Sequence, residues 1–351
     1  MEPSNGQKIP ISLLTGFLGS GKTTVLNHLL RQPAMANVMV IINEFGEIGL
    51  DHELVESATD DLVLLQSGCL CCTIRGDMIE TLRTLFAKRS RGNIPQFDRV
   101  VIETTGLADP APILQAIMTD GLVMSRFQLD GVVATVDAVA GGATLDRHIE
   151  AVKQAAVADR ILLTKTDIAS EDQSRAVERR LRALNPAAPI HRIGGGKVDP
   201  ALLFDVGLYN PATKSLDVQR WLQEEKYAQA DHGHDHHDHA DNDINRHDAH
   251  IKAISIVVDD PIPGEVLDNW LKSLMQFRGP DLLRFKGIVN VAGMQGPMVL
   301  HGVQHVIYPP VVLKAWPSAD RRTRLVFITY DIDEKTLRHS LDKLTKEAAA
   351  S

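Results

Sequence analysis

Short apolar runs alternate with amphipathic stretches along the first 200 positions of the chain. Runs of this kind are typical of buried parallel strands, and they occur at 8–15, 38–42, 62–65, 99–103, 131–137 and 160–163. Helical spacing of apolar residues follows several of them, as at 24–30 and 74–86. The alternation predicts an α/β domain with a doubly wound, mostly parallel sheet.

The pattern changes in the last hundred residues. Residues 251–258 alternate as a half-exposed strand, 264–276 have helical spacing, and a final helix is expected from Asp333. Further strands are expected near 282–292, 298–308 and 324–330, joined by hairpin-like connections, so a small α+β domain is predicted. His301, His305 and Trp316 lie in it and are expected to be packing or surface residues.

Between these domains, residues 228–250 contain almost no apolar side chains and seven of the fourteen histidines. Such a segment cannot bury a core. The predicted organisation is therefore a first domain at 8–208, a linker at 209–250 and a second domain at 251–346. One interpretation of the histidines is a solvated linker. The other is exchangeable binding of Zn²⁺, Ni²⁺ or Co²⁺ by His232, His234, His236, His237 and His239.

Composition narrows the class of partner. A net charge of −8 and a pI near 5.9 argue against a protein that binds nucleic acid by neutralising phosphates. No basic start followed by an apolar leader is present, and no apolar run approaches the roughly 18 residues of a membrane span. Three cysteines and no disulfide pattern fit a reducing compartment. We expect a soluble, cytoplasmic protein without membrane partners.

Gly16–Thr23 matches the phosphate-binding pattern G-x-x-x-x-G-K-[ST] in full, between a predicted strand and a predicted helix. Backbone N–H groups of such a loop wrap phosphates. Lys22 is expected to reach the β- and γ-phosphates and the Thr23 hydroxyl to bind Mg²⁺. The candidate nucleotide-binding residues here are Gly16, Gly19, Ser20, Gly21, Lys22, Thr23 and Thr24.

Two acids are candidates for the chemistry beside Lys22. Glu103 ends an apolar strand, with Gly106 three residues later, as in proteins that hold Mg²⁺ with the acid and sense the γ-phosphate with the glycine. Leu107 follows Gly106, where some GTPases carry a catalytic glutamine, so unaided hydrolysis is expected to be slow. Water is expected to be activated by an acid, with Glu44 as the candidate, or by a partner.

Thr164-Lys165-Thr166-Asp167 resembles the guanine-recognition pattern [NT]-K-x-D. An aspartate there can accept both N1–H and N2–H of guanine, and the stem of Lys165 packs over the base. Ser170 and Gln173 then predict a capping box that opens a helix. Gly194–Gly196 either closes over the base or simply ends the domain, with the second interpretation slightly favoured.

All three cysteines fall in Cys69-Leu70-Cys71-Cys72, which the pattern places in a strand-to-helix turn after 62–65. Three thiolates suit a soft or borderline divalent metal and leave one tetrahedral position for water, Glu47, a histidine or a partner's ligand. Because Cys71 and Cys72 are adjacent, binding of one ion by two thiolates and another ligand also stays open. The cluster is expected between the loop at 43–47 and Glu103.

In this order, the motifs resemble the CobW family of P-loop GTPases. The segments that carry the resemblance are Gly16–Thr23, Asn43–Glu47, Cys69–Cys72, Glu103–Gly106 and Thr164–Asp167. The resemblance implies GTP hydrolysis to GDP coupled to delivery of zinc, or of cobalt, nickel or iron, to a client metalloprotein, and a ferredoxin-like C-terminal domain. Some members carry an acid just before the Asn-Glu-Phe-Gly segment, where this chain has Ile42, so a metal site using that acid is not expected here.

Four functions compete on this basis. The leading one is a GTP-dependent zinc metallochaperone. The others are delivery of another metal, for corrin synthesis or a nitrile-hydrating enzyme, a metal-buffering protein in which hydrolysis plays no part, and a regulatory GTPase with a structural zinc site. A homodimer is compatible with all four.

Overall fold

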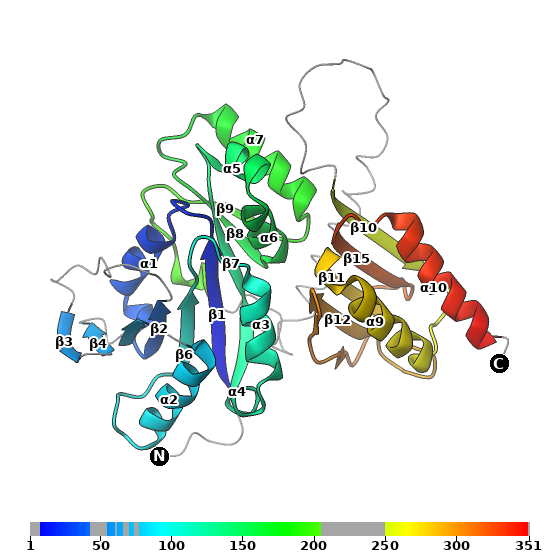
Figure 1. The fold of residues 1–351 in the computed structure, drawn as a ribbon, viewed down its shortest axis with the longest axis horizontal. Coiled ribbons are helices and arrows are strands. Elements are labelled where there is room, and N and C mark those ends of the chain that lie inside the picture. Colours follow the sequence, from blue (N-terminus) through cyan, green and yellow to red (C-terminus); the bar gives the residue numbers. More distant parts are fainter. Residues whose placement is uncertain are drawn as a thin grey trace. The chain divides into compact units, whose positions relative to one another are not determined.

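The computed structural model describes residues 8–42, 55–59, 62–65, 70–73, 77–204 and 250–349. They form two compact units, one drawn from Met1–Arg180 and Ala188–Asn210, the other from Leu181–Ala187 and Pro211–Ser351. Each unit is built on its own sheet (Figure 1). None of the helices in these residues is both long and apolar enough to cross a membrane.

The first unit has a nine-stranded sheet in the order β3-β4-β5-β2-β6-β1-β7-β8-β9. From β5 to β9 neighbouring strands pair in parallel, whereas β3 and β4 pair antiparallel, so the predicted doubly wound, mostly parallel α/β fold is confirmed. The strands are β1 (Ile9–Gly16), β2 (Val38–Ile42), β3 (Val55–Thr59), β4 (Leu62–Leu65), β5 (Leu70–Thr73), β6 (Arg99–Glu103), β7 (Phe127–Asp137), β8 (Arg160–Thr164) and β9 (Ile190–Arg192).

Helices connect these strands and cover the sheet (Figure 1). They are α1 (Lys22–Leu30), α2 (Met78–Ser90), α3 (Pro110–Thr119), α4 (Gly121–Arg126), α5 (Gly141–Arg147), α6 (Ile149–Val157) and α7 (Glu171–Leu184), with short 3₁₀ turns at Pro33–Met35 and Pro200–Leu202. The capping box of α7 is confirmed, because Ser170 N–H donates to Gln173 Oε1 at 2.9 Å and Gln173 N–H to Ser170 Oγ at 3.2 Å.

The core of this unit explains the continuous apolar runs. One face of α1 packs against β1, β2, β6, β7 and β8, and Val25, Leu26 and Leu29 on that face are at most 1% exposed. Strands buried on both faces need apolar residues at every position rather than at alternate ones.

The second unit is the predicted α+β domain. Its six-stranded antiparallel sheet has the order β10-β15-β11-β12-β13, with β14 paired to β12. Its elements are β10 (Ile251–Val258), α9 (Gly264–Arg278), β11 (Leu282–Val289), β12 (Met298–Val303), β13 (Val306–Ile307), β14 (Val311–Val312), β15 (Thr323–Tyr330) and α10 (Glu334–Ala349), with a 3₁₀ turn at Gly279–Asp281. The second helix follows the last strand, a variation on the β-α-β-β-α-β order of ferredoxin-like folds.

An aromatic cluster forms the core of the second unit. Trp270 of α9 meets Phe327 edge to face at 6.0 Å, and Phe327 stacks on Phe285 at the same distance. The expectation for His301, His305 and Trp316 is confirmed. His301 lies 4.4 Å from the Tyr308 ring, His305 Nδ1 is 3.2 Å from the Met275 carbonyl, and Trp316 packs against the Ile288 cluster.

Candidate nucleotide site

The phosphate-binding loop lies between β1 and α1, as predicted. Gly16 has φ 143°, and a Cβ atom there would stand 2.2 Å from Thr135 Oγ1 and 2.5 Å from the Thr135 carbonyl on β7. Only glycine allows this approach. Helix α1 begins after Gly21, which has φ 93°, and neither a side-chain cap nor an acid is present in its first turn. Its first N–H groups are therefore directed into the loop, where they suit an anion.

Lys22 is folded onto the loop that it serves. Its Nζ donates to the carbonyls of Gly16 at 2.9 Å and Phe17 at 3.2 Å, and the residue is only 5% exposed. A buried ammonium needs such acceptors. This places the predicted phosphate-binding charge at the mouth of the loop.

The structure brings the predicted magnesium ligand and the predicted acid together. Thr23 Oγ1 donates to Glu103 Oε1 at 3.1 Å, and Glu103 is 1% exposed at the end of β6. A hydroxyl and a carboxylate beside a phosphate loop are hard oxygen donors of the kind that Mg²⁺ prefers. The residues present therefore fit that ion.

Gly106 lies directly against the phosphate-binding loop. A Cβ atom at Gly106 would be 2.7 Å from the Leu18 nitrogen and 2.9 Å from its Cα. Thr104, just after β6, keeps this segment close to β1, because its N–H donates to the Leu14 carbonyl at 3.0 Å. The predicted γ-phosphate sensor thus stands next to the loop that holds the phosphates.

The predicted guanine-recognition segment follows β8 and is joined to the phosphate loop, since Thr164 Oγ1 donates to the Ser20 carbonyl at 2.6 Å. Lys165 has a left-handed backbone, φ 57°, and its Nζ donates to Asp137 Oδ2 at 2.6 Å. Asp137 ends β7 and also accepts from the N–H groups of Val139 and Ala140. Asp137 therefore fixes the lysine whose stem is expected to cover the base.

The glycine loop at 194–196 borders this site, and the favoured interpretation that it simply ends the domain is wrong. Gly195 N–H donates to Asp167 Oδ1 at 3.0 Å, and a Cβ atom at Gly196 would be 2.7 Å from Thr24 Cγ2. The loop therefore touches both Asp167, the aspartate predicted to recognise the base, and the start of α1. No local pattern reveals this, because the contacts join segments far apart in sequence.

Sequence reasoning also missed Thr135, Asp137 and Gln154. Thr135 Oγ1 lies 2.7 Å from Ser20 Oγ and holds the back of the phosphate loop. Gln154 donates from α6 to the carbonyls of Gly106 and Ala108. The only available signal was the position of Asp137 at the carboxyl end of a strand, where α/β sheets place their ligands.

Among the predicted metal ligands, Cys71 and Cys72 lie on a described backbone. They belong to β5, paired in parallel with β2 so that Cys71 is opposite Val40 and Cys72 opposite Ile41. The predicted turn is therefore wrong for these two residues, because they lie in an additional strand that pairs antiparallel with β4 and parallel with β2. Cys69, Glu44, Glu47 and the histidines at 232, 234, 236, 237 and 239 lie outside the described residues.

Within the described part of the chain, no group of three or more His, Cys, Asp or Glu residues is arranged to hold a metal ion. What this part does contain is a phosphate loop, an acid paired with its threonine and a base-recognition segment at one edge of a parallel sheet. These features define a P-loop nucleotide-binding protein.

Comparison with known proteins identifies the family. Residues 10–192 match the family described as CobW/HypB/UreG, nucleotide-binding domain, and residues 251–345 match the cobalamin synthesis protein cobW C-terminal domain. The chain belongs to the CobW/HypB/UreG family, as the motif order had indicated.

Individual relatives are similar in sequence to this chain over 60% to 96% of its length. The zinc chaperone YjiA of Escherichia coli (strain K12) is 33% identical over 338 residues, 96% of this chain and 99% of the relative. The zinc-regulated GTPase metalloprotein activator 1 of Schizosaccharomyces pombe is 33% identical over 223 residues, 60% of this chain and 53% of the relative. The crystal structure of Zn(II)-bound YjiA GTPase from E. coli aligns with a TM-score of 0.74 at 31% identity, covering 96% of this chain and 99% of that one.

The contact between Asp137 and Lys165 yields a prediction about pH. Burial acts to raise the pKa of Asp137, but the hydrogen bonds from Lys165 and from the N–H groups of Ala140 and Val139 outweigh it, so the pKa lies below its usual value. Because the folded-state pKa is lowered, the stabilisation is fully present above the usual aspartate pKa of about 4. It is lost as the pH falls through the lowered pKa.

Asp137→Asn is therefore expected to lower the melting temperature by an amount that is constant between about pH 7 and pH 5 and shrinks only below about pH 4. GDP affinity should fall by about three- to tenfold, because Lys165 loses its anchor. Melting curves across this pH range and titration with a fluorescent GDP measure both effects. A stability difference that already shrinks near pH 6 would show that Asp137 is not held ionised.

Proposed function

We propose that this protein is a GTPase that binds zinc at Cys69-Leu70-Cys71-Cys72 and transfers it to client metalloproteins, with transfer coupled to GTP hydrolysis. The names of the relatives support GTP and zinc as ligands. The particular cysteines, the client and the coupling are the parts that this proposal adds.

The observation that carries the coupling is the register of three neighbouring strands. Strand β2 pairs with the cysteine strand β5 on one side and with β6 on the other, and Ile42 is the partner of both Thr73 and Glu103. Neighbouring strands are roughly 4.8 Å apart, so β5 and β6 are separated by only about 10 Å. A change at Glu103 on nucleotide turnover reaches the cysteine strand through one shared, hydrogen-bonded neighbour.

Each residue of the nucleotide site has a role in this mechanism. Lys22 exchanges its contacts with the Gly16 and Phe17 carbonyls for the β- and γ-phosphates of GTP, and α1 directs N–H groups at the same phosphates. Asp167 accepts the guanine N–H groups, and Lys165 covers the base. Thr23 and Glu103 would hold Mg²⁺, which supplies charge stabilisation on the phosphates when bound.

Loss of the γ-phosphate is the event that the protein can sense. Gly106, three residues after the end of β6, lies against the phosphate loop. In the proposed mechanism its N–H contacts the γ-phosphate of GTP and loses that partner when GDP is bound. Thr104, two residues earlier, remains bonded to β1 through Leu14. Hydrolysis therefore acts on the short segment directly after Glu103, which is bonded to β1 at Thr104.

The test measures zinc affinity in two nucleotide states. Competition with a chromophoric zinc chelator is carried out with GDP and with a non-hydrolysable GTP analogue, on the wild-type protein and on Cys71→Ser and Cys72→Ser. We expect the two states of the wild-type protein to differ at least fivefold in zinc affinity, the lower end of typical coupling energies. By reciprocity, zinc must change the affinity for the analogue by the same factor.

Two outcomes would contradict the proposal. Equal zinc affinities in both nucleotide states would exclude coupling. Unchanged zinc affinity in both cysteine variants would remove the motif as the zinc site. Asp167→Asn, measured at the same concentrations of GDP and of the GTP analogue, is the matched control, because its weakened nucleotide binding should abolish the difference in zinc affinity without touching the cysteines.

A further inference from the structure

Helix α6 holds the segment that follows β6. Gln154 Nε2 donates to the Gly106 carbonyl at 3.1 Å and to the Ala108 carbonyl at 3.0 Å. A glutamine amide has two N–H donors, so this side chain uses both on one segment. Gln154 is 1% exposed, and bonds in such a site are not exchanged readily for bonds to water.

The preceding residue of α6 holds the same segment. Lys153 Nζ donates to Asp109 Oδ2 at 2.8 Å, with both side chains 28% exposed. Asp109 in turn caps α3, because its Oδ1 accepts from Ala111 N–H at 3.0 Å. Two consecutive residues of α6 thus fix residues 106–109 from their first carbonyl to the start of the next helix.

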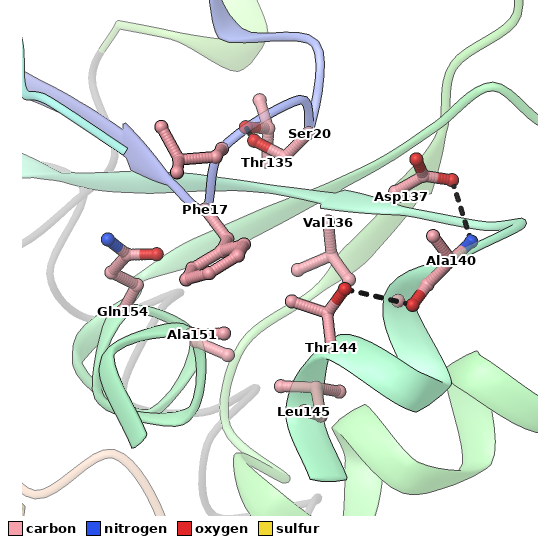
Figure 2. A pocket seen from close by; sticks show the side chains of 13 residues that line it. Phe17, Ser20, Thr135, Val136, Asp137, Ala140, Thr144, Leu145, Ala151 and Gln154 are labelled. Atoms are coloured by element: carbon pink, nitrogen blue, oxygen red, sulfur yellow. Dashed lines mark hydrogen bonds between the residues drawn. The ribbon is translucent and has the colours of Figure 1, made fainter. Parts of the chain in front are cut away.

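The same face of α6 also borders the phosphate loop. Figure 2 shows the Phe17 ring projecting from that loop into a pocket between α5 and α6, with Ala151 and Gln154 beside it. His148, the residue before α6, stacks on the Phe17 ring with centroids 4.5 Å apart and planes 27° from parallel. Because Gly106 also lies against Leu18, this glycine borders both the phosphate loop and Gln154 of α6.

The amide of Gln154 is costly where it stands. Its Oε1 is buried without a hydrogen-bond partner among the described residues, and in Figure 2 this oxygen points toward the pocket. An unpaired buried oxygen carries a desolvation cost that an apolar side chain of similar shape would avoid. The two bonds donated by Nε2 are therefore what this position gains from a glutamine.

We propose that Gln154 and Lys153 form a clamp that positions Gly106 for the γ-phosphate and so makes the protein prefer GTP over GDP. We call these two residues the α6 clamp. The proposal rests on the GTPase function proposed above. Glycine has the greatest backbone freedom of any residue, and the bonds to the Gly106 and Ala108 carbonyls remove that freedom before the nucleotide arrives. The binding of GTP then does not have to order this segment.

Comparing the affinities for a GTP analogue and for GDP distinguishes this role from a purely structural one. GDP lacks the γ-phosphate, so it gains nothing from an ordered Gly106. Gln154→Leu keeps the volume and removes both donors. We expect it to lower the affinity for a non-hydrolysable GTP analogue about tenfold, as for one to two buried hydrogen bonds, and to leave GDP affinity within about twofold.

Lys153 provides a second test at a more exposed position. Lys153→Met should weaken binding of the analogue by about two- to threefold, as expected for a half-exposed ion pair. Lys153→Arg should restore it, because the guanidinium can still reach Asp109. Glu150→Gln is the matched control, since Glu150 lies on the same helix outside the clamp. If Gln154→Leu fails to fold, the Lys153 pair still tests the clamp.

All affinities are measured by calorimetry or fluorescence on the full chain. A lower analogue-to-GDP affinity ratio in Gln154→Leu and Lys153→Met, restored in Lys153→Arg, supports the clamp. If the variants lose affinity equally for both nucleotides, so that the ratio is unchanged, the proposal is overturned. If the wild-type protein itself does not bind the analogue, the proposed function falls and the clamp with it, so the wild-type measurement distinguishes the two failures.

Discussion

Asp167→Asn is expected to change the preference of the protein from guanine to xanthine nucleotides. In the proposed site the Asp167 carboxylate accepts N1–H and N2–H of guanine, and each bond to a charged acceptor is worth about 1.5–3 kcal/mol. Asparagine can accept only one of them and presents an N–H₂ group to the other. Affinity for GDP should therefore fall about 100-fold or more.

Xanthine has a carbonyl where guanine has its N2 amino group, so it suits the new amide. The surroundings favour this exchange, because the asparagine oxygen can still accept the Gly195 N–H that Asp167 Oδ1 accepts at 3.0 Å. Titration with fluorescent GDP and XDP measures the switch. Asp172→Asn, an exposed acid in the first turn of α7, is the control. If Asp167→Asn still prefers GDP to XDP, the base is not bound at this segment.

Lys22→Ala is expected to reduce nucleotide affinity about 100- to 1000-fold and, under the function proposed above, to abolish zinc transfer to a client. Lys22 is the cation whose Nζ stands at the phosphate loop, within 2.9 Å of the Gly16 carbonyl and 3.2 Å of the Phe17 carbonyl. Its removal leaves the loop without the positive charge that is proposed to bind the β- and γ-phosphates. Charge-assisted bonds in a buried site are among the strongest that a protein makes.

Measuring zinc loading of a client shows whether the loss of nucleotide binding also stops zinc transfer. GDP affinity and zinc transfer to a purified client are measured together on the wild-type protein, on Lys22→Ala and on Lys8→Ala, which changes an exposed lysine just before β1. Loss of both activities in Lys22→Ala alone supports coupled transfer. If nucleotide binding is lost and the client is still loaded, the protein is a zinc buffer for which GTP hydrolysis plays no part.

Sequence patterns predicted those features that depend on neighbours along the chain. The phosphate loop, β4 at Leu62–Leu65 and the capping box at Ser170 all form as expected, because each follows from local backbone chemistry. The same holds for the acid that ends β6. Its hydrogen bond to Thr23 follows from parallel strands and their loops meeting at one edge.

The features that the patterns missed depend on tertiary contacts. The sequence pattern predicts a turn at Cys71 and Cys72 because an apolar run precedes them and helical spacing follows, but the structure has a short additional strand there, β5, paired to β2. Gly195 and Gln154 contribute through residues 28 and 46 to 48 positions away. No periodicity within a single element records such a pairing.

The start of α1 has a consequence for the abundance of the protein in a cell. Gly21 supplies no side-chain cap, and the first turn of α1 carries no acid. A Ser, Thr or Asp cap commonly contributes about 1 kcal/mol to the stability of a helix. A bound phosphate takes over that task. At a nucleotide concentration 100 times the Kd, binding adds about 2.7 kcal/mol to the free energy of unfolding. The folded population, and with it resistance to proteolysis, should therefore follow the supply of guanine nucleotide.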